Sequence, residues 1–553
     1  MKEDGISVIG VIPRHSQNNI YTKVKMPPVG IISVLSQLNN FGFKEVYAID
    51  ENNYGGPMDS TGMPDHTTLQ KREPAKIAMF YGGMSNSIPR MFSLAQQYKK
   101  FGAITIAGGS HVDALPGEAL KSGIDIVVHG EGEYSAQEIL KTVVIAKNGE
   151  AYFNYDELIK VKGISILDEN DKWLFTGKRE PIKNLDELVD VDLDLIKYME
   201  KRWSMIPVSR GRGCNYNCEF CAVNRQYGRY KASSPKKALK QIIRYSEKGY
   251  RDFFITDDNF AQSVNEAVEL CNMIENYKRK FNKKMELTVQ VRSEVAENDR
   301  LIEAMKRAGV TNLAIGYESP INEDLRAMNK GVRVEKLLER SIKLSKYFYL
   351  HGMFIFGYPK ELKPTSEKEP ELTLEQRAKL YEDFFKKARI DTVQVLNAVP
   401  IPGTGLRAKL EAEGRLLPVG WDKYDGQYLC YDPGPDVNAE ELQNIPRKLM
   451  KKWYLGNVMN RSLNYGNWMN WVYNTFGFPA LYTKLFFHNL AEKKKENLFP
   501  KRNTFVNAWG DIKREWRNLK LKTCGGIITR KWLKAYKESD YPKTLKEYFS
   551  KKS

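Results

Sequence analysis

Residues 211–221 of this chain have the sequence Gly-Arg-Gly-Cys-Asn-Tyr-Asn-Cys-Glu-Phe-Cys. Its three cysteines, Cys214, Cys218 and Cys221, are spaced C-x3-C-x2-C, so one short loop brings three thiolates to a single point. Thiolates are soft ligands that suit iron–sulfur clusters and zinc. A cubane cluster held by protein alone takes four cysteines, and the fourth is absent from this run. One iron would therefore keep an open coordination position, which a metal needs if it is to bind a substrate or cofactor directly.

This spacing resembles the signature of the radical S-adenosylmethionine (SAM) superfamily. The resemblance implies that the three cysteines hold a [4Fe–4S] cluster, whose free iron is chelated by the amino and carboxylate groups of SAM, and that one electron cleaves SAM to a 5′-deoxyadenosyl radical. Phe220 matches the aromatic position that the family places near the adenine. The alternatives are a zinc site or three buried thiols. A zinc site needs a fourth Cys or His at short spacing, whereas the nearest histidines, His129 and His351, are over eighty residues away.

The composition predicts a folded protein of several domains. A chain of 553 residues is too long for one ordinary core, and 42% hydrophobic with 11% aromatic residues suit a globular protein. Cys271, Cys430 and Cys524 are far apart and are expected to be plain thiols, not a disulfide framework. An oxygen-sensitive cluster implies a reducing cytoplasm. No signal peptide and no apolar run of about eighteen residues are visible, so we expect a cytoplasmic protein, with contact to the inner membrane surface as an open alternative.

Residues 1–145 show the alternation of strands and helices that predicts a doubly wound, Rossmann-like α/β sheet. In such sheets ligands bind at the carboxyl ends of the strands. Glycines recur at those ends and would let the backbone approach a bulky ligand closely. The predicted strands are 6–13, 46–50, 77–81, 103–107 and 125–128, and the predicted helices are near 29–41, 88–100 and 116–122.

Several motifs at these strand ends resemble the cobalamin-binding domain found in front of many radical SAM barrels. They are Pro27-Pro28-Val29-Gly30, Ala107-Gly108-Gly109-Ser110-His111, Leu115-Pro116-Gly117-Glu118-Ala119-Leu120 and Gly130-Glu131-Gly132-Glu133. The resemblance implies a corrinoid between this domain and the cluster domain, bound at Pro28, Ser85, Gly108, Gly109, His111, Gly130, Glu131 and Gly132. The D-x-H-x-x-G motif that supplies a lower axial histidine is missing, so the cobalt would be bound without a protein histidine. The alternatives are a Rossmann-like remnant without corrinoid and, for His111, an ordinary loop histidine.

Residues 146–200 are predicted to form a connector with a hairpin at 164–167 and 172–175. Residues 201–430 alternate six strands with helices and predict the partial (β/α)6 barrel of the superfamily, in which catalytic groups gather at strand carboxyl ends. A role in turns, caps or surface pairs is equally open for each residue at those ends. The predicted strands are 205–209, 252–256, 286–291, 312–316, 352–357 and 392–396; the SAM contacts implied by the resemblance are Phe220, Asp257, Asp258, Asn259, Arg292, Ser293, Gly316 and Glu318.

The C-terminal region, residues 431–553, is predicted to be basic, aromatic and mainly helical. Residues 1–200 sum to a charge of −6, residues 201–440 to +8 and residues 441–553 to +16, which together give the +18 of the chain. An aromatic segment precedes the basic run Lys493-Lys494-Lys495. A helical cap over the barrel mouth, a surface that docks on an anionic membrane and a nucleic-acid surface are all open. The lack of an RNA-binding motif or zinc ribbon disfavours the last.

These patterns predict a cobalamin-dependent radical SAM enzyme, with methyl transfer to an unactivated carbon of a lipophilic or natural-product substrate as the first hypothesis. A deoxyadenosyl radical can abstract hydrogen from an sp3 carbon, and the carbon radical can take a methyl group from methylcobalamin, which a second SAM then restores. No catalytic side chain is predicted beyond the cluster. The alternatives are radical cyclisation or oxidation of a tetrapyrrole or lipid, and a non-catalytic cobalamin sensor, which the intact cysteine run disfavours.

A methylthiolase is excluded because residues 1–200 contain no second set of cysteines. The expected partners are a small-molecule substrate, a flavodoxin- or ferredoxin-like one-electron reductant and a peripheral membrane contact through residues 441–553.

Overall fold

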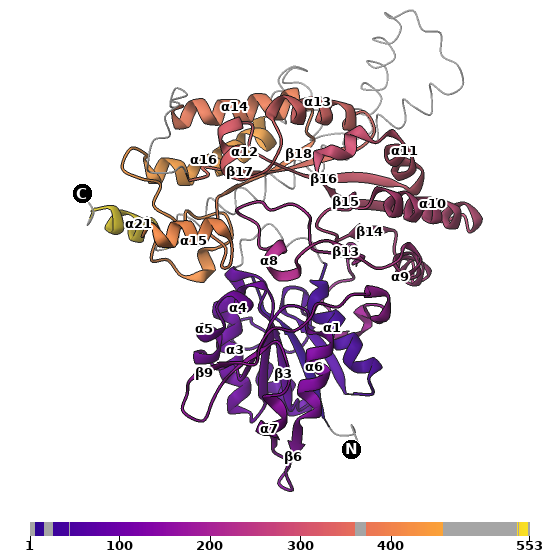
Figure 1. Cartoon of the computed structure of the whole chain (residues 1–553), viewed down its shortest axis with the longest axis vertical. Helices are drawn as coiled ribbons and strands as arrows, with labels where there is room; N and C mark the ends of the chain where they lie inside the picture. The colour runs from indigo at the N-terminus through magenta and orange to yellow at the C-terminus, as the bar shows by residue number, and fades with distance from the viewer. Residues whose placement is uncertain are drawn as a thin grey trace, which may run out of the picture.

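The computed structural model describes residues 6–15, 26–43, 45–359, 372–456, 539 and 541–550. These residues form two α/β units, each built on its own sheet, with the N-terminal unit below the second one in Figure 1. One hydrophobic core runs through both units, because it includes Val191 and Ile196 from the first unit and Ile206 and Tyr245 from the second. The predicted α/β class with parallel sheets is confirmed.

The first sheet has eight strands in the order β10-β2-β1-β3-β4-β5-β8-β9. From β10 to β5 every pair is parallel. The sheet is doubly wound, and the chain reverses its direction of travel across the sheet between β1 and β3, where ligands bind in such folds. Its strands are β1 (Val8–Ile12), β2 (Val46–Asp50), β3 (Ile77–Tyr81), β4 (Ile104–Gly108), β5 (Ile126–Val128), β8 (Ile164–Leu167), β9 (Trp173–Phe175) and β10 (Ile196–Lys197).

Both faces of this sheet are covered, which explains why its central strands are apolar along their whole length. Val8 and Ile12 of β1 pack into one core, whereas Ile9 and Val11 pack into the other. Because successive side chains of a strand point to opposite faces, a continuous apolar run is needed to fill both cores. The helices of this unit are α1 (Val29–Asn40), α2 (His66–Arg72), α3 (Ile88–Lys100), α4 (Ser110–Ala114), α5 (Pro116–Lys121), α6 (Gly132–Lys141) and α7 (Tyr155–Leu158).

The hairpin predicted in the connector forms as expected, but it belongs to the first sheet. β8 pairs antiparallel with β5, and β9 with β8. At the opposite edge β10 pairs with β2. The sheet thus takes in strands on both sides of residue 145, where the domain boundary was predicted. A short hairpin of β6 (Val143–Ile145) and β7 (Ala151–Phe153) projects beside it.

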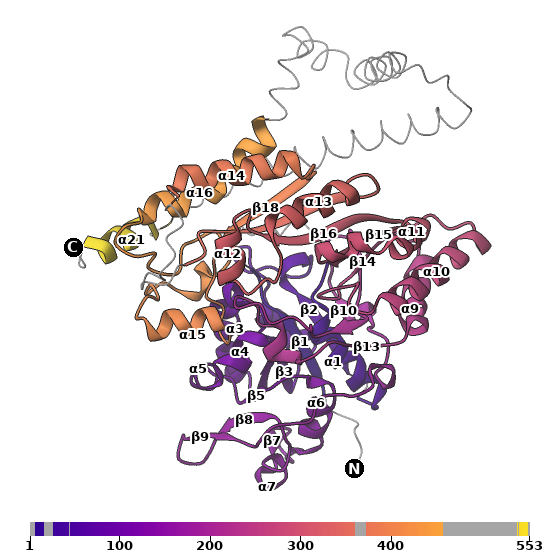
Figure 2. The same cartoon turned by 45° about the horizontal axis from the view of Figure 1, so that its top comes forward.

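The second sheet confirms the predicted partial barrel. Its six strands are all parallel and follow chain order, β11-β14-β15-β16-β17-β18. Figures 1 and 2 show helices around the outside of this sheet. The strands are β11 (Ile206–Val208), β14 (Asp252–Ile255), β15 (Glu286–Val291), β16 (Val310–Glu318), β17 (Tyr349–Phe356) and β18 (Thr392–Asn397). The helices are α9 (Pro235–Glu247), α10 (Val264–Lys280), α11 (Asp299–Ala308), α12 (Asn322–Ala327), α13 (Val334–Leu344), α14 (Leu374–Lys387) and α15 (Gly405–Ala412).

The described part of the C-terminal region packs on the edge of the barrel. Helix α16 (Ala439–Lys451) continues into a π-helical turn, Lys452–Gly456, in which the hydroxyl of Tyr454 donates to the carbonyl of Val393 on β18 at 2.5 Å. Helix α21 (Tyr541–Ser550) follows much later in the chain. The aromatic segment and the basic run, predicted to be helical, lie outside the described residues. Among the described helices, none has the length and apolarity to cross a bilayer.

Candidate functional site

The three cysteines lie on a loop that begins and ends at a small antiparallel ribbon. β12 (Gly211–Arg212) pairs with β13 (Lys231–Ala232), so Gly211 lies opposite Ala232 and Arg212 opposite Lys231. Between them the loop carries the cysteines and the short helix α8 (Val223–Tyr227). In Figure 1, α8 lies between the two sheets. The loop therefore presents its cysteines at the junction of the two units.

Cys214, Cys218 and Cys221 are partly exposed, and the cysteines that the structure describes are all free thiols. Burial raises the pKa of Cys218, which Lys330 and Arg292 oppose, and it raises the pKa of Cys221 to about 11. The raised pKa values keep the thiols of Cys218 and Cys221 protonated at neutral pH until a metal displaces the protons. In the described part of the chain no three His, Cys, Asp or Glu side chains are arranged to hold a single metal ion. The assignment of these three partly exposed thiols to a [4Fe–4S] cluster stays a prediction.

Asp257 follows β14 and fixes the beginning of the cysteine loop. Its Oδ1 accepts hydrogen bonds from the backbone N–H of Arg210 at 3.1 Å and of Gly211 at 2.6 Å. Its Oδ2 lies 3.4 Å from Nε of Arg210, and both side chains are fully buried. Burial is the largest influence on the pKa of Asp257 and raises it, while Arg210 and these N–H groups act to lower it. The carboxylate predicted to contact SAM is thus committed to the loop, and a SAM contact stays a prediction.

Asp258, the next residue, lines a cavity and also accepts a hydrogen bond from the backbone of Gly213 in the cysteine loop. Burial first, and then the charge of Asp257, raise its pKa to about 6. A raised carboxyl pKa means that the folded protein favours the protonated form of Asp258. The stability that Asp258 contributes is therefore complete below its ordinary pKa of 3.8 and is lost as the pH rises through 6.

Replacing Asp258 with asparagine is therefore expected to stabilise the cofactor-free protein at pH 8. Asparagine cannot ionise, so the variant avoids the cost of a buried negative charge, up to about 3 kcal/mol for a shift of about two units. The gain should shrink toward pH 4, where the wild-type carboxyl is protonated too. Thermal unfolding of both proteins at a series of pH values measures this, and a gain that is the same at all pH values would contradict it.

Asn259 and Gln262 connect the end of β14 to the cysteines. The Asn259 side chain accepts from the N–H of Arg292 at 3.4 Å and donates to Oε1 of Gln262 at 3.4 Å. The same Gln262 oxygen lies 3.5 Å from the N–H of Asn215 and 3.8 Å from Sγ of Cys214. Sequence reasoning missed Gln262, because nothing in its neighbours distinguishes it from an ordinary residue ahead of α10.

Arg292 lies at the end of β15 with its guanidinium 3.8 Å from the ring centre of Tyr216, which belongs to the cysteine loop. It donates to the carbonyl of Lys330 at 2.7 Å. Lys330 in turn forms a buried ion pair of 2.8 Å with Glu318, which has a left-handed φ of +62° at the end of β16. A Cβ at Gly316 would overlap the Glu318 carboxylate, so a side chain there would displace that carboxylate from its present position.

The structure thus brings Arg292 and Glu318 close to the cysteines, together with Tyr216 and Lys330, which sequence reasoning missed. Ser293 is buried beside them and accepts from Arg340 at 3.2 Å. Phe220 is partly buried against the core. Contacts of these residues with SAM stay predictions.

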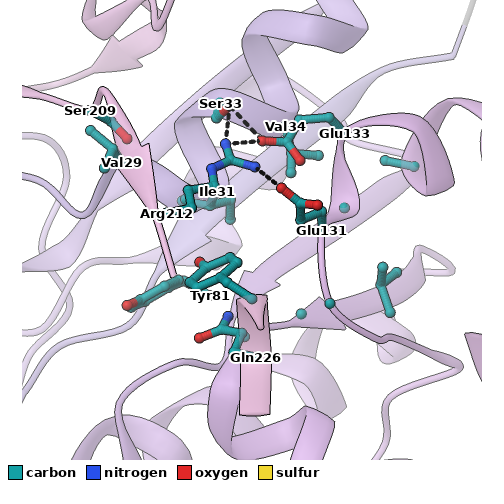
Figure 3. A pocket seen from close by; sticks show the side chains of 18 of the residues that line it. Val29, Ile31, Ser33, Val34, Tyr81, Glu131, Glu133, Ser209, Arg212 and Gln226 are labelled. Atoms are coloured by element: carbon teal, nitrogen blue, oxygen red, sulfur yellow. Dashed lines mark hydrogen bonds and ion pairs between the residues drawn. The ribbon is translucent and has the colours of Figure 1, made fainter. Parts of the chain in front are cut away.

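A cavity of about 250 Å³ lies between the ends of β3, β4 and β5 and the cysteine loop (Figure 3). From the first unit it is lined by Gly108, Gly109, Gly130, Glu131 and Gly132, five of the predicted cobalamin contacts. From the second unit Gly211, Arg212 and Asp258 line it. The two units therefore share this cavity.

One glycine of the cavity allows two strand ends of the first unit to approach each other closely. Gly109 has a φ of +127°, and a Cβ there would come within 2.5 Å of the nitrogen of Gly83. Small-molecule pockets commonly measure about 300–1,000 Å³, so a corrinoid would extend beyond this cavity. The glycines that line the cavity and its position at the strand ends fit a corrinoid, part of which would lie outside the cavity.

Three predicted cobalamin contacts lie apart from the cavity lining. Pro28 is the N-cap of α1. His111 is buried, with Nδ1 2.9 Å from the hydroxyl of Ser85 and its ring 4.6 Å from that of Trp421. Trp421 also donates from Nε1 to Glu118 at 2.7 Å, so this pair joins α4 and α5 to the C-terminal side of the barrel. Corrinoid contacts for Pro28, Ser85 and His111 stay predictions.

Comparison with known proteins places these features in one family. The model of the radical SAM superfamily matches residues 208–365, which begin at the end of β11 and include the three cysteines. An uncharacterised methyltransferase of Pyrococcus horikoshii is 28% identical over 363 residues, which cover 63% of this chain and 72% of that protein. The bacteriochlorophyllide d C-12(1)-methyltransferase of Chlorobaculum tepidum is 24% identical, covering 69% and 75%.

The solved structure of OxsB, a cobalamin-dependent SAM radical enzyme with aqua-cobalamin and SAM bound, matches 99% of this chain and 84% of its own with a TM-score of 0.59 and 14% identity. The chain therefore contains a radical SAM domain, and its fold is that of a cobalamin-dependent radical SAM enzyme. TsrM from Kitasatospora setae, a radical SAM methyltransferase, matches 74% of this chain and 77% of its own with a TM-score of 0.57 and 16% identity. At these low identities the solved structures show only that this chain shares their fold. The relatives named as methyltransferases indicate that the chain is an enzyme and not a non-catalytic sensor.

The radical SAM enzyme also has a relative that performs other chemistry. The anaerobic magnesium-protoporphyrin IX monomethyl ester cyclase of Cereibacter sphaeroides is 26% identical over 278 residues, which cover 48% of this chain and 44% of that protein. Membership in the family therefore leaves the reaction to be argued from the site.

Proposed function

We propose that this radical SAM enzyme transfers a methyl group to an unactivated carbon of a lipophilic substrate, with a [4Fe–4S] cluster, SAM and cobalamin as cofactors. The observation that carries the proposal is the shared cavity. Gly211, Arg212 and Asp258 beside the cysteines and Gly108, Gly109 and Gly130 at the strand ends line the same space. A cluster held by the cysteines and a corrinoid held at the strand ends would then be adjacent, so that SAM bound at the cluster could reach the corrinoid. When bound, the cluster supplies the electron that cleaves SAM, and the corrinoid supplies the methyl group.

The residues of the chain bind and orient these groups. Cys214, Cys218 and Cys221 would hold the cluster after losing their protons. Asp258, whose pKa of about 6 leaves it ionised at neutral pH, would pair with the amino group of SAM. Arg292 would attract the SAM carboxylate, since a guanidinium suits a planar anion.

Anaerobic reconstitution with iron, sulfide and hydroxocobalamin, followed by methyl-labelled SAM under reduction, tests the proposal. We expect bound corrinoid, a full cluster, 5′-deoxyadenosine and label on the corrinoid. A full cluster with 5′-deoxyadenosine and no bound corrinoid would overturn methyl transfer. A corrinoid-loaded enzyme that forms 5′-deoxyadenosine without ever accepting the label would favour ring formation or oxidation, the reaction class of the cyclase relative.

The lipophilic substrate and the partners are part of the proposal. The methyltransferase relative of C. tepidum is named for a tetrapyrrole substrate, and residues 441–553 combine aromatic side chains with a charge of +16. Such a composition suits an anionic membrane surface. Flotation of the intact chain with anionic vesicles tests this membrane contact, and failure of the chain to bind the vesicles would contradict it. A flavodoxin- or ferredoxin-like protein would deliver the electron.

A further inference from the structure

The cysteine loop is held to the first unit by four charged side chains that sequence reasoning did not group together. Arg212 and Lys231 are direct cross-strand partners on the β12–β13 ribbon. Glu131 and Glu133 lie at the beginning of α6, where Glu131 is the N-cap. Two cations at the base of the loop therefore meet two carboxylates from the wall of the cavity. Figure 3 shows Arg212 between Glu131 and Glu133.

The contacts in this group are short and shared. Arg212 Nη1 lies 2.9 Å from Glu131 and Nη2 lies 2.5 Å from Glu133, while Lys231 lies 2.5 Å from the second oxygen of Glu131. Ser33 donates to Glu133 at 2.7 Å. The four charged side chains are only 3–17% exposed, which separates them from the surface pairs that contribute little.

We propose that Arg212, Lys231, Glu131 and Glu133 form a positioning network that fixes the cysteine loop over the cavity and so sets the separation of the cluster site and the corrinoid site. The proposal rests on the proposed function for the second site. Glu131 then acts by holding the loop, in addition to the corrinoid contact predicted for it. Arg212 and Lys231 lie on the two strands at the base of the loop, so separating them from the carboxylates would free the loop from the first unit while Asp257 still holds its beginning to the barrel.

The physical reason is the cost of leaving a buried charge without its partner. Glu131 pairs with both cations, whereas Glu133 pairs with Arg212, so removing Glu133 leaves Arg212 with Glu131 alone, which Lys231 also uses. A second link between the loop and the first unit, from Arg225 to the carbonyl of Asp113 at 3.2 Å, is a single hydrogen bond on the exposed side. The buried ion pairs are thus expected to dominate the attachment.

Hydrogen exchange on the cofactor-free protein tests the network without any need for activity. Glu133→Gln is expected to speed the exchange of amides in residues 208–232 on the order of tenfold, because local opening of the ribbon costs less free energy. Glu138→Gln is the matched control. It makes the same change on the same helix, but Glu138 pairs with Arg179 at 2.6 Å, away from the cysteine loop. Equal exchange of residues 208–232 in both variants and the wild type would overturn the proposal.

A spectroscopic measurement separates positioning from general stability. In reconstituted protein, the electron paramagnetic resonance signal of cob(II)alamin should be broadened by the reduced cluster in the wild type and in Glu138→Gln. In Glu133→Gln the broadening should weaken at unchanged iron and cobalamin contents. Unchanged broadening in Glu133→Gln would overturn the proposal. If the protein binds no corrinoid, the proposed function is wrong. The hydrogen-exchange experiment would still test whether the network holds the loop, because it uses the cofactor-free protein.

Discussion

Replacing Cys221 with alanine is expected to abolish the iron content of the reconstituted protein and its cleavage of SAM. Cys221 is one of three free, partly exposed thiols on a single loop, and a cluster held by three cysteines has no spare ligand. Mutation of a residue that only hydrogen-bonds to a metal ligand typically lowers metal affinity or activity about ten- to a hundredfold. Loss of a ligand itself should therefore lower the rate of SAM cleavage more than about a hundredfold. Iron analysis and 5′-deoxyadenosine formation under reduction provide the two readings.

Cys271→Ala is the control for this prediction. Cys271 is a buried thiol on α10, so its loss should cost some stability and leave the iron content unchanged. Full iron binding in Cys221→Ala, or equal loss of iron in Cys271→Ala, would contradict the assignment of the cluster to the loop.

Asp257→Asn is expected to destabilise the cofactor-free protein by about 3 kcal/mol, because it leaves the buried guanidinium of Arg210 without its buried carboxylate. The amide oxygen of asparagine can still accept the two backbone hydrogen bonds, so the loss isolates the ion pair. Glu266 also contacts Arg210, at 2.9 Å, but its side chain is 45% exposed and offers weaker compensation. Denaturant unfolding at pH 8 measures the change.

The neighbouring residue provides a control of opposite sign. Asp258→Asn is the same substitution one position later. It should stabilise the cofactor-free protein at pH 8, because burial raises the pKa of Asp258 and no cation is among the groups that act on it, whereas Asp257 is paired with Arg210. If both variants lose the same stability, the two carboxylates have the same role, and the division between a loop anchor and a cavity carboxylate is wrong.

Much of the fold follows from patterns within short segments. The helix predicted at 88–100 is α3, with the same bounds, and the six barrel strands were each predicted within a few residues. Apolar runs and helical spacing are local properties, so they can be read without knowing the partners. The strand order of the barrel also follows from sequence, because successive parallel strands joined by helices usually lie side by side.

The candidate site was predicted less completely, because adjacency in sequence does not show where a side chain points. Asp257 and Asp258 both follow β14 and were predicted to have one role, yet Asp257 pairs with the buried Arg210, whereas Asp258 lines the cavity. His111 was grouped with the cavity glycines and instead packs on Trp421. Trp421 is about three hundred residues away in sequence, so no local pattern could connect them.

By itself, the sequence determined the chemistry of the cysteine loop and the order of two α/β units, because three thiols within eight residues and the strand–helix periodicity are short-range features. Only the tertiary structure decided which residues surround that loop. Arg212 meets Glu131 and Glu133, which are 81 and 79 residues away, and the hairpin β8–β9 joins the first sheet instead of a separate connector. Which buried charges pair and which sheet edge accepts another strand depend on contacts between segments far apart in sequence, so both are determined only when the whole chain packs.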